Sequence, residues 1–253
     1  MKDRPHGRRS TTLCLLSLVF LPGGPAPAAD PPPFDPTDRY EARTVQGWPV
    51  LVNKGFLTGN PDLAGDTLAL LGDQLYQAQR QVPGEALAKL RTVRIWVEER
   101  EPHHPCMAYH PDPGWLRTHG MNPAKARGVE VANARNFLKW THEQPWMVLH
   151  ELAHAYHHQF LKEGYGNPEV LAAFRGANEA KRYASVLHHD GKEVRAYAAT
   201  NPMEYFAESS EAFFGSNDFY PFVRAELRRH DPEMDALLGV LWGSRGLTRP
   251  GCR

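Results

Sequence analysis

The sequence lacks an excess of charge of either sign. Its 253 residues include 29 lysines and arginines and 29 aspartates and glutamates, so the formal net charge is zero. A net charge of zero indicates neither a basic nucleic-acid-binding protein nor an acidic, disordered chain, and we expect no nucleic-acid partner. No internal repeat of fixed period is visible either, so nothing favours a repeat architecture.

Long apolar runs are also lacking. The run Leu13–Leu21 is far too short to span a bilayer as a helix. It follows a basic start and precedes Ala26-Pro27-Ala28, a small-residue cleavage site. This order predicts a secretory signal peptide over residues 1–29, and hence an exported protein, extracellular or periplasmic, without stable membrane association once the signal is removed. The alternatives are an N-terminal membrane anchor or a loose tail.

Cysteine is scarce, with three in the chain. Cys14 lies inside the apolar run, so removal of the signal peptide leaves Cys106 and Cys252. The two can form a disulfide in an oxidising compartment. The sequence alone does not bring them together, so the pairing stays open.

Strand patterns come early in the chain and helix patterns come late, which predicts an α+β fold with a small mixed sheet and C-terminal helices. A proline-rich lead-in covers 30–38, and a flexible tail covers 244–253. No linker divides residues 39–243, so we expect one domain there. The expected elements are hairpins at 42–55 and 185–197, a helix at 64–82, strands at 92–99 and 128–133, a surface loop at 101–127, helices near 145–162 and 168–182, and two or three helices within 202–242.

The predicted helix near 145–162 carries the run HELAH. Its apolar residues recur at steps of three and four and form one stripe that must face the core. His150 and His154 are one turn apart beside that stripe, so both imidazoles can close on one metal ion. Glu151 points to the side of that site, where a water molecule would lie. This is the H-E-x-x-H pattern of zinc peptidases; the alternative is a polar helix face with two ordinary histidines.

A catalytic zinc site needs a third protein ligand and an open position. The extended motif with a third histidine is excluded, because His157 and Phe160 stand where it requires glycine and histidine. The predicted helix after Asn201 instead offers Glu204, with Glu208 one turn later to hold a ligand imidazole. The plainer alternative is that Glu204 only caps that helix. Glu211 lies on the same face, where we expect it to be solvated.

HELAH followed by YAATNPMEYFAE at 197–208 resembles the catalytic domain of anthrax lethal factor and its relatives, within the gluzincin metallopeptidases. The resemblance is sharp over residues 148–214. It implies a zincin-like domain with one Zn²⁺ held by His150, His154 and Glu204. It further implies that Glu208 supports a ligand from behind and that Tyr197 stabilises the oxyanion. It does not carry over the toxin's substrate.

Other histidine-bearing segments have plainer interpretations. His157 and His158 flank the metal site, and His188 and His189 precede a turn and are expected at the surface. The segment 103–106 can bind a metal or mask the zinc with a thiolate, although a disulfide or a buried thiol is favoured for its cysteine. By analogy with zincin folds, the strand at 128–133 is expected to be the edge strand that binds substrate.

These patterns together predict a secreted zinc metalloendopeptidase with Glu151 as general base, acting on a peptide or protein substrate. Two alternatives stay open: a zinc amide hydrolase acting on cell-wall peptide, and a non-catalytic binding protein with the zincin fold. An intact Glu151 argues against the second, because a pure binding protein needs no base there. The sequence does not indicate an oligomeric state.

Overall fold

The computed structural model describes residues 34–244. The predicted signal peptide, residues 30–33 of the lead-in and the predicted tail beyond Ser244, with Cys252, lie outside the described residues. The first element pair is the predicted hairpin, made by β1 (Tyr40–Val45) and antiparallel β2 (Trp48–Asn53). Gln46 and Gly47 connect the strands with φ of 50° and 87°. Positive φ at both central residues matches the right-handed twist of a hairpin.

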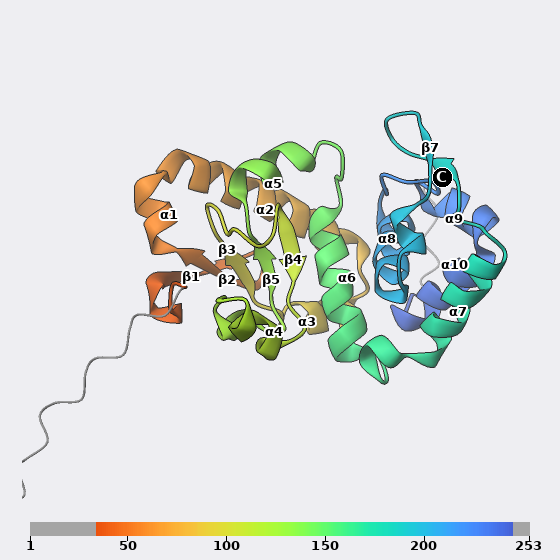
Figure 1. Ribbon diagram of the computed structural model, residues 1–253, viewed down its shortest axis with the longest axis horizontal. Coiled ribbons are helices and arrows are strands. Elements are labelled where there is room, and N and C mark those ends of the chain that lie inside the picture. Colours follow the sequence, from red (N-terminus) through yellow and green to blue (C-terminus); the bar gives the residue numbers. More distant parts are fainter. Residues whose placement is uncertain (1–33, 245–253) are drawn as a thin grey trace, which may run out of the picture. The chain divides into compact units, whose positions relative to one another are not determined.

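The hairpin extends into a five-stranded mixed sheet of order β1-β2-β3-β5-β4 (Figure 1). β3 (Ile95–Val97) is parallel to β2, and β5 (Val129–Val131) is parallel to β3. β4 (Met107–Tyr109) pairs antiparallel with β5 and forms one edge. The expectation that 128–133 is the edge strand is therefore wrong. β4, a three-residue strand within the expected surface loop, pairs with the outer side of β5 and takes the edge position.

The segment 101–127 is more ordered than predicted. Besides β4, it contains α4 (Pro113–Thr118) and a 3-10 turn at Pro123–Lys125. Lys125 is 3% exposed and ion-pairs with Glu98 at 2.7 Å and with Glu130. A buried lysine needs such partners, and this cluster fixes the segment against the sheet.

Helices cover the sheet and lead to the candidate site. The described elements here are α1 (Lys54–Gly59), α2 (Pro61–Gln81), α3 (Gly84–Leu90), α5 (Ala134–Trp140) and α6 (Met147–Phe160). α6 contacts α2, α3, β4 and β5, and on its other side it contacts α8. It therefore lies between the sheet and the C-terminal helices (Figure 1).

The C-terminal part is helical, as predicted. It contains α7 (Pro168–Glu179), a short hairpin of β6 (Val186–Leu187) and β7 (Glu193–Val194), α8 (Pro202–Phe214), α9 (Arg224–His230) and α10 (Pro232–Leu241). α8 is the central helix, since it contacts α6, α7, α9 and α10. No helix among residues 34–244 is long and apolar enough to cross a membrane.

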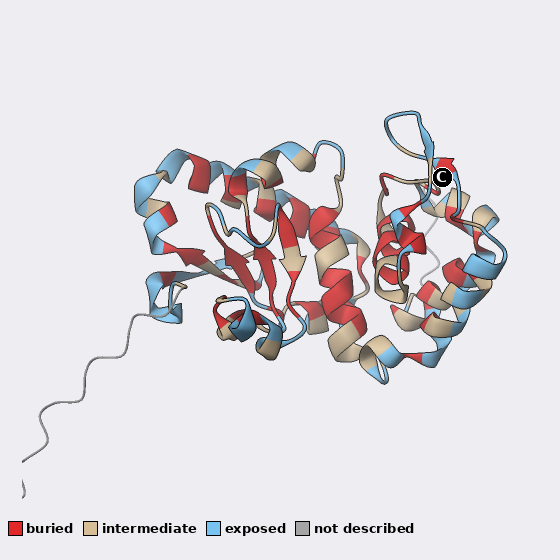
Figure 2. Ribbon diagram, in the orientation of Figure 1, coloured by how far each residue is buried: buried red, intermediate tan, exposed pale blue. Residues whose placement is uncertain are grey.

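The core runs from the sheet through α6 to α8. Figure 2 shows the inner strands and much of α6 and α8 as buried, whereas α1 and the outer face of α7 are largely exposed. The largest fully buried side chains include Trp48, Trp96, Phe137, Tyr205 and Trp242. The predicted α+β class, with a small mixed sheet, the helix that carries HELAH and helices at the C-terminal end, is confirmed. It is compatible with a single zincin-like domain.

Candidate active site

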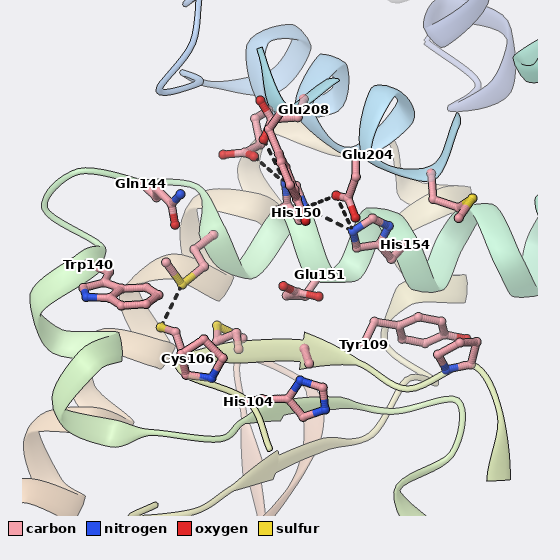
Figure 3. Close-up of a pocket in the computed structure, with 18 of the residues that line it drawn as sticks. His104, Cys106, Tyr109, Trp140, Gln144, His150, Glu151, His154, Glu204 and Glu208 are labelled. Atoms are coloured by element: carbon pink, nitrogen blue, oxygen red, sulfur yellow. Dashed lines mark hydrogen bonds and ion pairs between the residues drawn. The ribbon is translucent and has the colours of Figure 1, made fainter. Parts of the chain in front are cut away.

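α6 presents its histidines at the border of a buried face. Leu149, Leu152, Ala153 and Tyr156 are all at most 3% exposed and anchor the helix in the core. His150 lies one turn before His154, and their rings meet edge to face with centroids 4.7 Å apart. Both side chains point toward α8 (Figure 3). Packing of the apolar stripe therefore fixes the direction of the two imidazoles.

α8 supplies the carboxylate that meets them. Its first turn is capped by Asn201, whose side chain accepts hydrogen bonds from the backbone N–H groups of Met203 and Glu204, both at 2.9 Å. Pro202 occupies the first helical position, where a missing N–H costs nothing. The cap uses Asn201 rather than the Glu204 side chain, so the Glu204 carboxylate is free to face α6.

Three ligand atoms converge between the helices. Glu204 Oε2 lies 3.1 Å from His150 Nε2 and 3.2 Å from His154 Nε2, and the two Nε2 atoms are 3.1 Å apart. Tetrahedral ligands at about 2.0–2.1 Å from Zn²⁺ are separated by roughly 3.3–3.4 Å. The sides of the triangle are thus close to the ligand separations that a tetrahedral zinc would need, and all three residues line a cleft.

The hydrogen-bond roles favour a positive charge inside this triangle. Glu211 Oε1 lies 2.7 Å from His150 Nδ1, so the N–H group at Nδ1 donates a hydrogen bond to that carboxylate. A neutral His150 then turns the lone pair of Nε2 toward the Glu204 carboxylate oxygen, another acceptor, at 3.1 Å. Burial lowers the pKa of His150, but its bonds to Glu204 and Glu211 outweigh this effect and hold the pKa well above the usual value. A proton or a metal ion satisfies the arrangement, so the donor set fits Zn²⁺.

Glu211 is not solvated, contrary to expectation. It is 3% exposed and bonds to His150 from the last turn of α8. Glu208 is equally buried, but its Oε1 is 3.7 Å from His150 Nδ1, and its Oε2 accepts from Asn217 Nδ2 at 3.1 Å. Burial raises the pKa of both carboxyls. The sequence placed both residues on the correct face, but the approach of α8 to α6 decides which one reaches the imidazole.

A cleft of about 550 Å³ opens over the triangle. Glu151 lines it from α6 and points toward the sheet, away from α8 (Figure 3). Within residues 34–244 its carboxylate forms no hydrogen bond or ion pair with another side chain. Tyr197 lines the cleft from the 3-10 turn before α8 and is 47% exposed. Partial burial, with Glu204 nearby, raises the pKa of Tyr197, so its hydroxyl stays protonated.

β4 forms the wall of the cleft opposite α8. Cys106 and His110 form backbone hydrogen bonds with the β5 side of the sheet. In an antiparallel pair the bonding residues alternate, so the N–H and C=O groups of Met107 and Tyr109 point away from β5. Neither residue forms another backbone hydrogen bond in the described part of the chain. The outer edge of β4 can therefore pair with an extended peptide.

The other histidines stay apart from the triangle. His157 is fully buried, and His158 meets the Tyr109 hydroxyl at 2.8 Å. His188 pairs with Asp190 at 2.8 Å near the surface turn. His104 lines the cleft, and burial lowers its pKa. None of the four joins a metal-binding group within the described residues.

Cys106 is a buried thiol in the cleft wall. Its Sγ lies 3.3 Å from Met147 Sδ, and burial together with Glu151 raises its pKa to about 12. Cys106 belongs to neither of the groups that could hold a metal ion among the described residues. Cys106 is buried, and the choice between the two favoured alternatives, a buried thiol or a disulfide with Cys252, lies outside the described residues.

Several cleft residues were not singled out from the sequence. Trp140 and Gln144 line one part, and Pro111 and Tyr165 line another. They come from connections around β4, α5 and α6, so no local spacing links them to HELAH. Met147, the first residue of α6, also lines the cleft and was not part of the predicted apolar stripe.

No protein-family model matches the chain, and no curated protein matches it. Among solved structures, the chain is similar to one described as the PRO-PRO endopeptidase (PPEP-2) from Paenibacillus alvei. The two are 19% identical over an alignment that covers 72% of this chain and 90% of that chain, with a TM-score of 0.39. A likeness of this size assigns neither a family nor an activity. The comparisons hold no evidence specific to the lethal factor family.

Proposed function

We propose that this chain is a zinc-dependent metalloendopeptidase of the gluzincin type that acts outside the cytoplasm. The observation that carries the proposal is the triangle of His150 Nε2, His154 Nε2 and Glu204 Oε2, with sides of 3.1–3.2 Å. Zn²⁺ held by these three residues would lower the pKa of water toward neutrality and polarise a substrate carbonyl.

Glu151 is the general base in this proposal. Its carboxylate lines the same cleft and is not engaged by another side chain, so it is available to accept a proton. It takes that proton from the attacking water as the new C–O bond forms, then delivers it to the leaving amine as the C–N bond breaks. Tyr197 keeps its hydroxyl proton and donates a hydrogen bond to the oxygen on which negative charge develops.

Substrate binding is proposed along β4. An extended peptide that adds to this edge receives hydrogen bonds from Met107 and Tyr109 and runs past the triangle. Among residues 34–244, no lysine or arginine lines the cleft. A free α-carboxylate therefore finds no cationic anchor there, which favours cleavage inside a chain over removal of its last residue. A peptide cross-link of a cell wall fits the same cleft and is the second substrate class to test.

The decisive experiment compares the wild type with Glu151→Gln. Both proteins are analysed for metal and incubated with an unbiased peptide library, with and without a chelator. We expect close to one zinc per chain in both, and hydrolysis lowered by about 10²–10⁴-fold in the variant because a positioned base is lost. Near-normal turnover by Glu151→Gln, or wild-type cleavage that survives removal of the metal, would contradict the proposal.

A further inference from the structure

We infer that Glu211, and not Glu208, is the positioning residue that orients His150 toward the metal. The inference rests on the proposed function and concerns the opposite side of the imidazole. Glu211 Oε1 lies 2.7 Å from His150 Nδ1, whereas Glu208 Oε1 lies 3.7 Å away from the same nitrogen. The first distance is within hydrogen-bond range and the second is outside it. The motif resemblance assigns this support to Glu208 instead.

The contacts of Glu208 explain the difference. Its other oxygen accepts a hydrogen bond from Asn217, which lies in the connection between α8 and α9. Glu211 has no second hydrogen-bond donor among the described side chains. It is 3% exposed, so water does not compete for the carboxylate. Its contact is directed at His150 alone.

α8 thereby holds both nitrogens of one imidazole. Glu204 faces Nε2 from the first turn, and Glu211 faces Nδ1 from a position seven residues later, two helical turns along the same face. A carboxylate on Nδ1 fixes the tautomer with the lone pair on Nε2 and strengthens that nitrogen as a ligand. One rigid helix therefore sets the ligand oxygen and the direction of the neighbouring ligand nitrogen together.

A second metal ion behind His150 is the competing interpretation. Nδ1 and the carboxylates of Glu208 and Glu211 lie close enough to surround a cation. Two ligands of one zinc are separated by roughly 3.3 Å. Nδ1 and Glu211 Oε1 are closer than that, at 2.7 Å, which suits a direct hydrogen bond. We therefore assign one metal to the triangle and a proton to the contact with Glu211.

The test measures zinc affinity directly, by competition with a chromogenic chelator, on metal-free wild type, Glu211→Ala, Glu211→Gln and Glu208→Gln. We expect Glu211→Ala to bind zinc about 10–100-fold more weakly. Glu211→Gln should lose less zinc affinity than Glu211→Ala, because the amide oxygen still accepts a hydrogen bond from Nδ1–H of His150. Glu208→Gln is the matched control of equal burial on the same helix, and it should lose less than Glu211→Gln.

The melting temperature of the metal-free proteins separates positioning from folding. Glu211→Gln keeps an acceptor for Nδ1–H but loses a negative charge that faces His150, so the metal-free variant is expected to melt no higher than the wild type. A lower melting temperature with unchanged zinc affinity would make Glu211 structural. A larger loss in Glu208→Gln than in Glu211→Gln, or two zinc ions per wild-type chain, would also overturn the inference. Absence of zinc binding by the wild type would overturn the proposed function as well.

Discussion

At the scale of single residues, the Tyr197 hydroxyl tests how the site stabilises charge. The ring is 47% exposed at the rim of the cleft, so it contributes little packing to the core. A donor to the oxyanion acts in the transition state more than in the ground state. Tyr197→Phe should therefore lower kcat by about 10–10³-fold with little change in KM, zinc content or melting temperature. Steady-state kinetics showing a wild-type kcat would leave the oxyanion to another donor.

His157 lowers the stability of the fold, because it is fully buried and neither ring nitrogen has a hydrogen-bond partner within the described residues. Burial lowers the pKa of His157 to about 3. In the unfolded chain His157 binds a proton near its ordinary pKa of 6.5, whereas in the folded chain it stays neutral down to about pH 3. The free energy of unfolding is therefore highest above pH 6.5 and falls as the pH decreases from 6.5 toward 3. The slope from this residue approaches about 1.4 kcal/mol per pH unit.

Replacement by a residue that does not titrate should remove that slope. We expect His157→Leu to be at least as stable as the wild type near pH 7, because an unpaired buried polar group is removed. Between pH 6.5 and 4 it should lose stability more slowly. Chemical denaturation of metal-free proteins across this range measures the difference. Parallel pH profiles for the two proteins would show that His157 is not protonated on unfolding.

The residues of the candidate site were largely predictable, since helical spacing alone unites His150 and His154 and directs Glu151 to their side. Glu204 followed from the need for a third ligand. The position of Glu211 did not follow, although it was recognised on the same face as Glu204. Its contact with His150 depends on the distance and angle between α6 and α8, which no spacing within α8 encodes.

At the scale of elements, one glycine sets how closely α8 approaches α6. Gly215 ends α8, and a Cβ added there would lie 1.8 Å from the Trp146 ring at the start of α6. In Gly215→Ala, the Trp146 ring or the adjoining ends of α6 and α8 must shift, near His150 and Glu211. We expect a lower melting temperature and weaker zinc binding.

The matched control is Gly65→Ala on the exposed face of α2, where the added carbon meets nothing within 4 Å. This substitution should raise the free energy of unfolding by about 0.5–1 kcal/mol, because alanine is favoured over glycine inside a helix. Equal effects of the two substitutions would contradict this account.

The long periodic elements were predicted and the short ones were not. The hairpin, α2, α6 and α8 follow from alternation, helical periodicity and caps. β4 was missed because three residues, Met107–Tyr109, cannot show an alternating pattern among the prolines and histidines around them. That omission also misplaced the sheet edge. The edge position is a property of the strand order, which local sequence does not state.

At the scale of the whole molecule, the proposed metal joins two parts of the chain that follow one another in sequence. His150 and His154 belong to the helix packed on the sheet, whereas Glu204 belongs to the C-terminal helices. In the proposal, these three polar side chains add to the apolar packing of the junction an electrostatic contact that a cation would complete. The same junction forms the cleft, so stability and the open position for substrate share one set of residues.

Removal of the metal should therefore weaken the whole fold. A ligand that binds only the folded state stabilises it by about 4 kcal/mol at a free concentration 1,000 times its Kd. In a domain of this size, each kcal/mol of stability shifts the melting temperature by about 2–4 °C. Chelation should therefore lower the melting temperature by on the order of 10 °C. Differential scanning fluorimetry with and without chelator, followed by addition of zinc, measures the fall and its reversal. Glu204→Gln should show little response to either addition, because one corner of the triangle is weakened. A wild type that melts at the same temperature with and without zinc would mean that the two parts are held together without the metal.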